Sequence, residues 1–96
     1  MTRIIWSPQS VRDLESIRAY IAADSPEYAD LAIRRILATV ERLAEFPESG
    51  RIVPERNAAE IREVIAGRFR VVYRLRGGHV EVATVFRGSM RFPETF

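Results

Sequence analysis

The spacing of apolar residues changes once along this chain, near residue 60, and the change limits the folds open to it. Before that point apolar residues recur every three or four positions, which is the period of an amphipathic helix. After it they recur at a period of 2, which is typical of β-strands. Helices followed by a run of strands predict an α+β protein.

Two serine–proline pairs mark the expected helix starts. Ser7-Pro8 and Ser25-Pro26 each place a hydroxyl at the N-cap and a proline at the first helical position. The apolar stripes that follow predict one helix over residues 8–23 and a second that ends near Phe46. The short break between them predicts an antiparallel helical hairpin.

The rest of the chain is predicted to be strands and loop. Residues 3–7 are β-branched and aromatic and predict a short first strand, whereas residues 47–60 predict a loop. Three more strands are expected, over residues 61–66, 69–75 and 80–86. Gly77-Gly78 favours a tight hairpin between the last two, because its primed turn needs positive φ angles.

The turn at Gly77-Gly78 also predicts a register. Leu75 then faces Val80, and the expected pairs beyond it are Arg74–Glu81, Tyr73–Val82, Val72–Ala83, Val71–Thr84, Arg70–Val85 and Phe69–Phe86. The face that holds residues 69, 71, 73 and 75 is apolar, so we expect the helices to cover it. Arg70 and Arg74 are then expected on an open face of the sheet.

Length and composition restrict the class of protein. Ninety-six residues, 47% of them apolar, suffice for a single domain over residues 1–96 with a buried core. The chain has no cysteine, which excludes disulfides and thiolate metal sites. The apolar run at residues 4–6 is too short for a signal-peptide core or a membrane span, so we expect a cytoplasmic protein.

The basic charge is carried entirely by arginine and is unevenly placed. All fifteen cations are arginines. Residues 1–50 hold six arginines against eight acids, a net of −2, and residues 51–96 hold nine against five, a net of +4. An acidic partner is therefore expected to dock on the C-terminal half.

Arginines on the expected open face are the first candidates for binding. Arg70 and Arg74, with Arg87 near them, have the composition of an anion or nucleic-acid footprint. The alternative is a solvated face whose arginines pair with Glu63 and Glu81.

Other polar residues offer little chemistry. His79 is the only histidine, and it flanks the glycine turn, where we expect a solvated residue and no proton transfer. Trp6 and Phe46 are predicted to be core. The acid pairs are predicted to lie on a helix surface and a strand edge: Asp13 with Glu15, and Glu60 with Glu63. No metal site, phosphate loop or cofactor is expected.

Several segments follow one another in a recognisable order: Trp6-Ser7-Pro8 with Asp13-Leu14, Ile17 and Tyr20-Ile21; residues 43–47 with Gly50-Arg51; and residues 61–63, 68–74 and 80–91. Together they resemble the RelE/ParE toxin superfamily over nearly the whole chain. The resemblance implies a β-α-α-β-β-β fold with a helical hairpin packed on a small antiparallel sheet. It also implies the toxin of a type II toxin–antitoxin module, neutralised by an antitoxin whose disordered C-terminal segment folds onto it.

The superfamily has two branches, and this chain can be compared with the site residues of the RelE-like branch. RelE-like members cut mRNA in the ribosome, and ParE-like members inhibit DNA gyrase. Of the RelE-like site only Arg70 matches clearly; residues 61–63 hold no lysine, Arg87 stands where many relatives have a histidine, and no tyrosine follows Tyr73. Arg70 and Arg87 could stabilise the negative charge of a phosphorane, but arginine exchanges protons poorly. We therefore expect no catalytic residue.

The resemblance therefore favours a ParE-like growth inhibitor that acts by binding DNA gyrase. The alternatives are a ribosome-dependent mRNA endoribonuclease that uses Arg70 and Arg87, and a degenerate, non-toxic relative that binds only its antitoxin. The expected contacts with a target or nucleic acid are Arg70, Arg74, Arg87, Met90 and Arg91.

Two expectations concern the surfaces of such a toxin. The end of the chain is expected to be mobile and to expose Met90 and Phe92; the alternative is that Phe92 and Phe96 fold back over the sheet edge. The antitoxin segment is expected to be acidic and amphipathic, and either to add a strand at a sheet edge or to lay a helix in an apolar groove.

Overall fold

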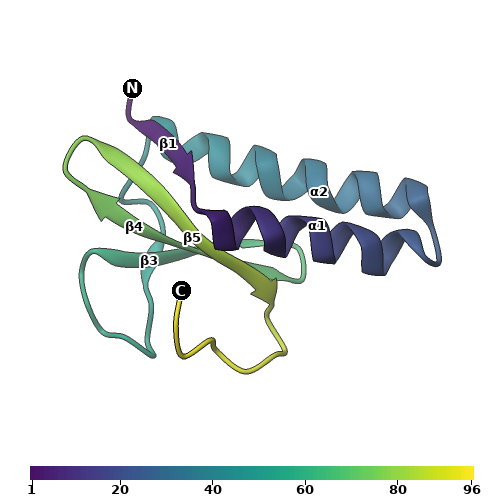
Figure 1. Cartoon of the computed structure of the whole chain (residues 1–96). Helices are drawn as coiled ribbons and strands as arrows, with labels where there is room; N and C mark the ends of the chain where they lie inside the picture. Colours follow the sequence, from purple (N-terminus) through teal and green to yellow (C-terminus); the bar gives the residue numbers. More distant parts are fainter.

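The computed structural model describes residues 1–96 and consists of two helices packed on one face of a sheet (Figure 1). The elements in chain order are β1 (Arg3–Trp6), α1 (Pro8–Ala22), α2 (Pro26–Glu41), a 3₁₀ turn η1 (Arg42–Ala44), β2 (Arg51–Ile52), β3 (Ile61–Ala66), β4 (Phe69–Arg76) and β5 (His79–Arg87). The α+β class and the helical hairpin are confirmed. No helix is long and apolar enough to cross a membrane.

The sheet has five strands in the order β1-β5-β4-β3-β2 and is mixed. β3, β4 and β5 are antiparallel as expected, but β1 pairs in parallel with β5, so the sheet is not wholly antiparallel. β2 lies inside the predicted loop and pairs with β3 through only Arg51 and Ile52. A strand of two residues is too short to produce a periodic pattern in the sequence.

Both helices begin where the serine–proline pairs predict. The Ser7 hydroxyl accepts a hydrogen bond from the Ser10 amide at 3.1 Å, and the Ser25 hydroxyl accepts one from the Tyr28 amide at 3.2 Å. The second helix ends earlier than expected, because the chain tightens into η1 after Glu41. Phe46 consequently leaves the apolar stripe and is 61% exposed, so its predicted place in the core was wrong.

The register of the last hairpin follows the prediction near the turn and departs from it farther along. Leu75–Val80, Arg74–Glu81 and Tyr73–Val82 pair as expected, and the register then shifts between Val72 and Tyr73. The remaining predicted pairs were wrong; the observed ones are Val72–Thr84, Val71–Val85, Arg70–Phe86 and Phe69–Arg87. Ala83 is the extra residue of a β-bulge on β5.

The bulge is held by the start of α1. The Ser7 hydroxyl donates to the Ala83 carbonyl at 2.9 Å. The Asp13 carboxylate accepts from the Thr84 hydroxyl at 2.6 Å and from the Val85 amide at 3.0 Å. Asp13 was predicted to lie on the helix surface; that was wrong, because the bulge leaves an amide that only a side chain from α1 reaches.

The helices cover the predicted apolar face of the sheet. Phe69 and Val71 belong to the main core cluster with residues of α2, and Tyr73 packs with Leu43 of η1 and near Leu75. Trp6 packs against the same main cluster, as expected for a core residue. This face therefore holds most of the buried apolar surface that stabilises the fold.

The opposite face of the sheet was expected to be open, and it is covered. Val53, Val72 and Phe86 form a buried cluster on it, and Phe92 and Phe96 pack against that cluster. Figure 1 shows the chain after β5 turning back toward the sheet. The expectation was wrong because the residues after β5 carry enough aromatic surface to cover this face.

Tyr73 joins the sheet to the loop before β2. Its side chain is fully buried, and its hydroxyl accepts from the Gly50 amide at 2.9 Å and donates to the Pro47 carbonyl at 2.8 Å. A β-carbon on Gly50 would lie 2.5 Å from the Tyr73 hydroxyl oxygen, so the close approach requires glycine. Burial raises the pKa of Tyr73, which keeps the hydroxyl protonated and able to donate.

We expect Tyr73→Phe to lower the free energy of unfolding by about 1–3 kcal/mol, since it leaves the buried Gly50 amide and Pro47 carbonyl unpaired. Urea denaturation measures the change. The matched control is Tyr28→Phe, which removes the same atom from an exposed side chain and should cost less than about 0.5 kcal/mol. Equal effects of the two variants would contradict the role of the Tyr73 hydroxyl.

Candidate functional site

Arg70, the residue that matches the RelE-like site, is fully engaged within the protein. Its side chain on β4 is 12% exposed. Nε donates to Glu63 at 2.5 Å, while Nη1 and Nη2 donate to the two carboxylate oxygens of Glu55 at 3.1 and 2.9 Å. These bonds, Glu55 first, raise the pKa of Arg70. The planar fork that would grip a phosphate is occupied by two carboxylates.

Glu63 is the buried centre of this cluster. It is 1% exposed and accepts from Arg51 Nε at 2.5 Å as well as from Arg70. It was predicted to lie at a strand edge; that was wrong, because the loop after β2 and the end of the chain cover its face of β3. The pairing of this face's arginines with Glu63 and Glu81, expected in the alternative, is confirmed, since Arg74 also lies 3.3 Å from Glu81. The solvated face expected in that alternative was wrong, because Phe92 and Phe96 pack over it.

Three arginines stack on the aromatic rings that cover this face, which we call the closed face. The guanidinium of Arg70 lies 5.2 Å from the ring of Phe86 and 5.1 Å from that of Phe92. Arg56 and Arg74 lie 4.6 and 4.7 Å from the ring of Phe96. Cation–π contacts of this kind hold charge and ring together where water is partly excluded.

Hydrogen bonds fix the end of the chain in the same place. Arg74 donates to the main-chain oxygen of Phe96 at 2.7 Å, and Arg56 donates to that of Glu94 at 2.8 Å. Phe92 was expected to be exposed and is packed instead, so the alternative in which Phe92 and Phe96 fold back is correct. They cover the face of the sheet and not its edge.

Arg87 does not share a face with Arg70 and Arg74. The bulge at Ala83 reverses the alternation of β5, so Arg87 points to the helix side, where its guanidinium lies 5.7 Å from the ring of Tyr20. The sequence gives no local signal for a bulge, which is why the three arginines were grouped together.

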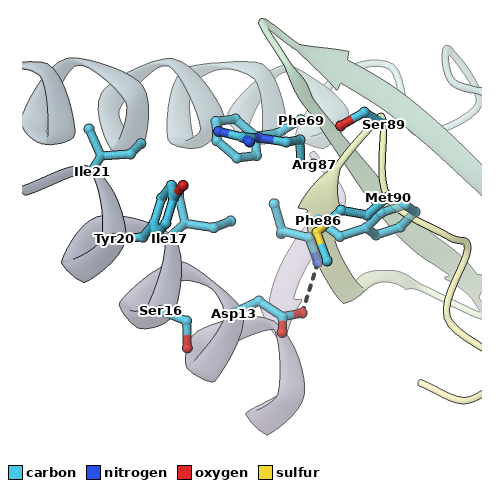
Figure 2. Close-up of a pocket in the computed structure, with 11 residues that line it drawn as sticks. Asp13, Ser16, Ile17, Tyr20, Ile21, Phe69, Phe86, Arg87, Ser89 and Met90 are labelled. Carbon is cyan, nitrogen blue, oxygen red and sulfur yellow. Dashed lines mark hydrogen bonds between the residues drawn. The ribbon is translucent and has the colours of Figure 1, made fainter.

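Arg87 and the residues after it border a hollow that we call the α1–β5 groove (Figure 2). It has a volume of about 520 Å³ and is lined mainly by apolar side chains. α1 supplies one wall, with Ile17, Tyr20 and Ile21, and Arg87, Ser89 and Met90 supply the other. Met90 is 62% exposed, and Arg91 next to it is exposed too. Sequence reasoning placed Met90 and Arg91 at the surface and expected an apolar groove along the helices, but it did not say which residues line the groove.

No other residue assembles a reactive centre. His79 is the first residue of β5 and pairs with Arg76, at the opposite end of β4 from Arg70. Nowhere do three histidine or acidic side chains gather as metal ligands would.

The comparison with protein families agrees with this architecture. A family model described as the ParE toxin of the type II toxin–antitoxin system parDE matches residues 4–92. The chain belongs to the ParE toxin family. The match includes every helix and strand except the first residue of β1, Arg3, so it concerns the whole fold.

Individual relatives are similar to this chain over almost its whole length. Toxin Y4kP of Sinorhizobium fredii is 36% identical over 93 residues, which are 96% of this chain and 94% of that protein. Toxin RelE2 of Caulobacter vibrioides is 30% identical over 86 residues, 88% of this chain and 93% of that one. A chain in the structure of the chromosomal ParDE system from P. aeruginosa has the same fold, with a TM-score of 0.75, 22% identity, and coverage of 91% and 96% of the two chains.

Removing residues 89–96 from this ParE-family chain should lower the melting temperature by several degrees. The truncation uncovers Val72 and Phe86, and each kcal/mol lost corresponds to about 4–8 °C in a domain of this size. Arg91→Glu is the control, since it changes an exposed, unpaired side chain in the same segment and should shift the melting temperature by less than about 3 °C. An unchanged melting temperature after truncation would show that the segment does not pack in solution.

Stability should fall in acid partly through Glu55. The hydrogen bond from Arg70 lowers the pKa of Glu55 below its ordinary value of 4.5, so the contribution is complete above pH 4.5 and is lost as the pH falls through the folded-state pKa. Urea midpoints measured downward through this range should decline less steeply for Glu55→Gln than for the parent. Because Glu55 is 42% exposed, the difference should be modest. If the urea midpoints of Glu55→Gln and the parent fell equally steeply with pH, the contribution of Glu55 would be contradicted.

Proposed function

We propose that this ParE-family chain arrests growth by binding DNA gyrase and that it does not cut RNA. Membership of the ParE family over residues 4–92 supports the role of toxin in a type II module. The choice of binding over cleavage rests on the hydrogen bonds that Arg70 makes within the protein. Its donors are taken by Glu55 and Glu63 beneath the closed face, so it is not presented to a phosphate.

Proton transfer is the second argument against cleavage. Cutting RNA through its 2′-hydroxyl needs one group to accept a proton and another to donate one. Arginine does neither readily, and His79 lies at the far end of the hairpin from Arg70. The hydrogen bond from Arg70 lowers the pKa of Glu55, which makes this carboxylate a weak base.

The contact with the target is proposed to lie on Arg87, Met90 and Arg91. Neither arginine is within ion-pair distance of an acid, and Met90 adds exposed apolar surface between them. Arg70 and Arg74, first considered as contacts, are proposed to act indirectly by holding the end of the chain on the closed face. Permanent cations next to an exposed thioether suit an acidic or DNA-bound partner.

The likeness to a relative named RelE2 gives the alternative its support. In that alternative the chain is a ribosome-dependent endoribonuclease, and Arg70 would have to be released from Glu55 and Glu63 to meet RNA. A degenerate relative that only binds its antitoxin would be inactive in both assays. Each possibility therefore has a different biochemical signature.

Two assays on the purified protein decide among these functions. We expect inhibition of gyrase supercoiling, and no cleavage of mRNA on programmed ribosomes. Arg91→Glu should weaken the inhibition while leaving the fold intact, because its side chain is exposed and unpaired. His79→Ala is the control and should inhibit like the parent. Ribosome-dependent cleavage that Arg70→Ala abolishes would refute the proposal.

A further inference from the structure

We infer that a basic trough between α2 and the edge of β3 binds a single strand of nucleic acid, a ligand that goes beyond the proposed function. The trough consists of two hollows of about 140 and 350 Å³. Arg35 and Arg68 line the first hollow, and Arg42 and Arg51 line the second. Each hollow has α2 or η1 on one side and β3 or the turn after it on the other. We call this surface the α2–β3 trough.

The helical wall of the trough is a row of side chains that point in one direction. Tyr28, Arg35 and Arg42 follow one another at intervals of seven residues, which is close to two full turns of a helix, and Thr39 lies between the two arginines. At 1.5 Å per residue the row from Tyr28 to Arg42 is about 21 Å long. This wall therefore presents an aromatic ring and two cations at regular spacing.

The other wall is the uncovered part of the sheet edge. β2 pairs with β3 only at Arg62 and Glu63, so no strand lies beside residues 64–66. Arg51 on β2 and Arg68 after β3 lie at the two ends of this stretch. Backbone N–H groups at an uncovered sheet edge are able to donate to an anion. The second wall thus adds a cation at each end and backbone donors between them.

The cations of the trough are free to bind a ligand. Arg35, Arg42 and Arg68 are exposed, and none lies within ion-pair distance of an acid. Arg51 gives only its Nε to Glu63, and its side chain is 63% exposed. Glu63 is the one acid that lines the two hollows, and two arginines already compensate its charge. The trough therefore has an excess of permanent cations, which suits a chain of phosphates.

The aromatic ring identifies the ligand more closely. Tyr28 is 59% exposed beside Arg35 and Arg68. An exposed ring next to arginines is a platform on which an unpaired base stacks while the cations hold the backbone. A strand with stacked bases carries one phosphate per 3.4 Å, so the 21 Å row spans about six phosphates. The bases of a duplex are paired and do not reach such a ring, so we assign a single strand.

Two other occupants fit less well. An extended acidic peptide would pair with the edge of β3, but the uncovered stretch at residues 64–66 is at the lower limit of strand length. A second copy of this chain in a two-fold dimer would bring Arg35 and Arg42 toward their own copies, and like charges there oppose association. A nucleic-acid strand brings charges of the opposite sign along the whole trough.

The test measures binding of a fluorescent oligothymidylate of twelve residues to the purified protein by anisotropy at several salt concentrations. The logarithm of the association constant should fall against the logarithm of the salt concentration with a slope of about −3, from four arginines at about 0.7 each. Arg35→Gln combined with Arg42→Gln should weaken binding about tenfold or more and reduce the slope by about 1.4. Tighter binding of an oligouridylate would support the inference and identify the strand as RNA.

Matched controls remove the same groups elsewhere. Arg12→Gln combined with Arg34→Gln removes two exposed cations outside the trough and should bind within about threefold of the parent, with the slope retained. Tyr28→Ala should weaken binding about fivefold or more through lost stacking, whereas Phe46→Ala, at an exposed ring outside the trough, should not. Thermal unfolding of every variant checks that the fold is retained.

Equal losses in the two double variants would overturn the inference, because attraction would then depend on net charge alone. An oligoglutamate of the same length that binds as tightly as the oligothymidylate would also overturn it. So would a duplex that binds as tightly, together with an unchanged affinity of Tyr28→Ala for the single strand. None of these measurements involves gyrase. A failure of the gyrase proposal would appear only in the supercoiling assay and leaves this test unaffected.

Discussion

The closed face of the sheet depends on the buried carboxylate of Glu63. A carboxylate that is 1% exposed destabilises a fold unless cations and hydrogen bonds compensate it, and Arg51 and Arg70 do so. Once Arg70 is fixed by Glu63, its remaining donors hold Glu55 on the loop after β2. Its flat guanidinium also supports the rings of Phe86 and Phe92. A single ion cluster thus places one loop and the end of the chain.

This arrangement divides the arginines by role. The arginines of the closed face bind internal carboxylates and stack on aromatic rings. They therefore stabilise the fold, even though arginine is the side chain best suited to binding phosphate. Arg87, which borders the α1–β5 groove, lies within ion-pair distance of no acid, and its guanidinium lies beside the ring of Tyr20. We therefore propose that the target-binding capacity of the C-terminal half, which carries a net charge of +4 from nine arginines and five acids, is concentrated near Arg87 and not on the closed face.

Local signals predicted the elements well, and distant contacts account for the errors. Serine–proline pairs and the Gly77-Gly78 turn act within a few residues, so the helix starts and the first hairpin pairs follow from sequence. The burial of Glu63 depends on residues near the end of the chain, some thirty positions later, and no pattern around Glu63 reveals it. Met90 and Arg91 were predicted at the surface from their place after the last strand, but the groove needs the packed positions of α1 and β5.

The bulge at Ala83 shows how such a distant contact shapes the candidate site. Strict alternation from Val82 would place Phe86 over the helices and Arg87 on the closed face. One extra residue, held by Ser7 and Asp13, reverses this: Phe86 joins Val72 on the closed face, and Arg87 turns toward Tyr20. The same insertion therefore supplies the ring on which Arg70 stacks and the cation that borders the groove. Both the closing of one face and the position of Arg87 beside the α1–β5 groove follow from a polar contact between the start of α1 and the middle of β5.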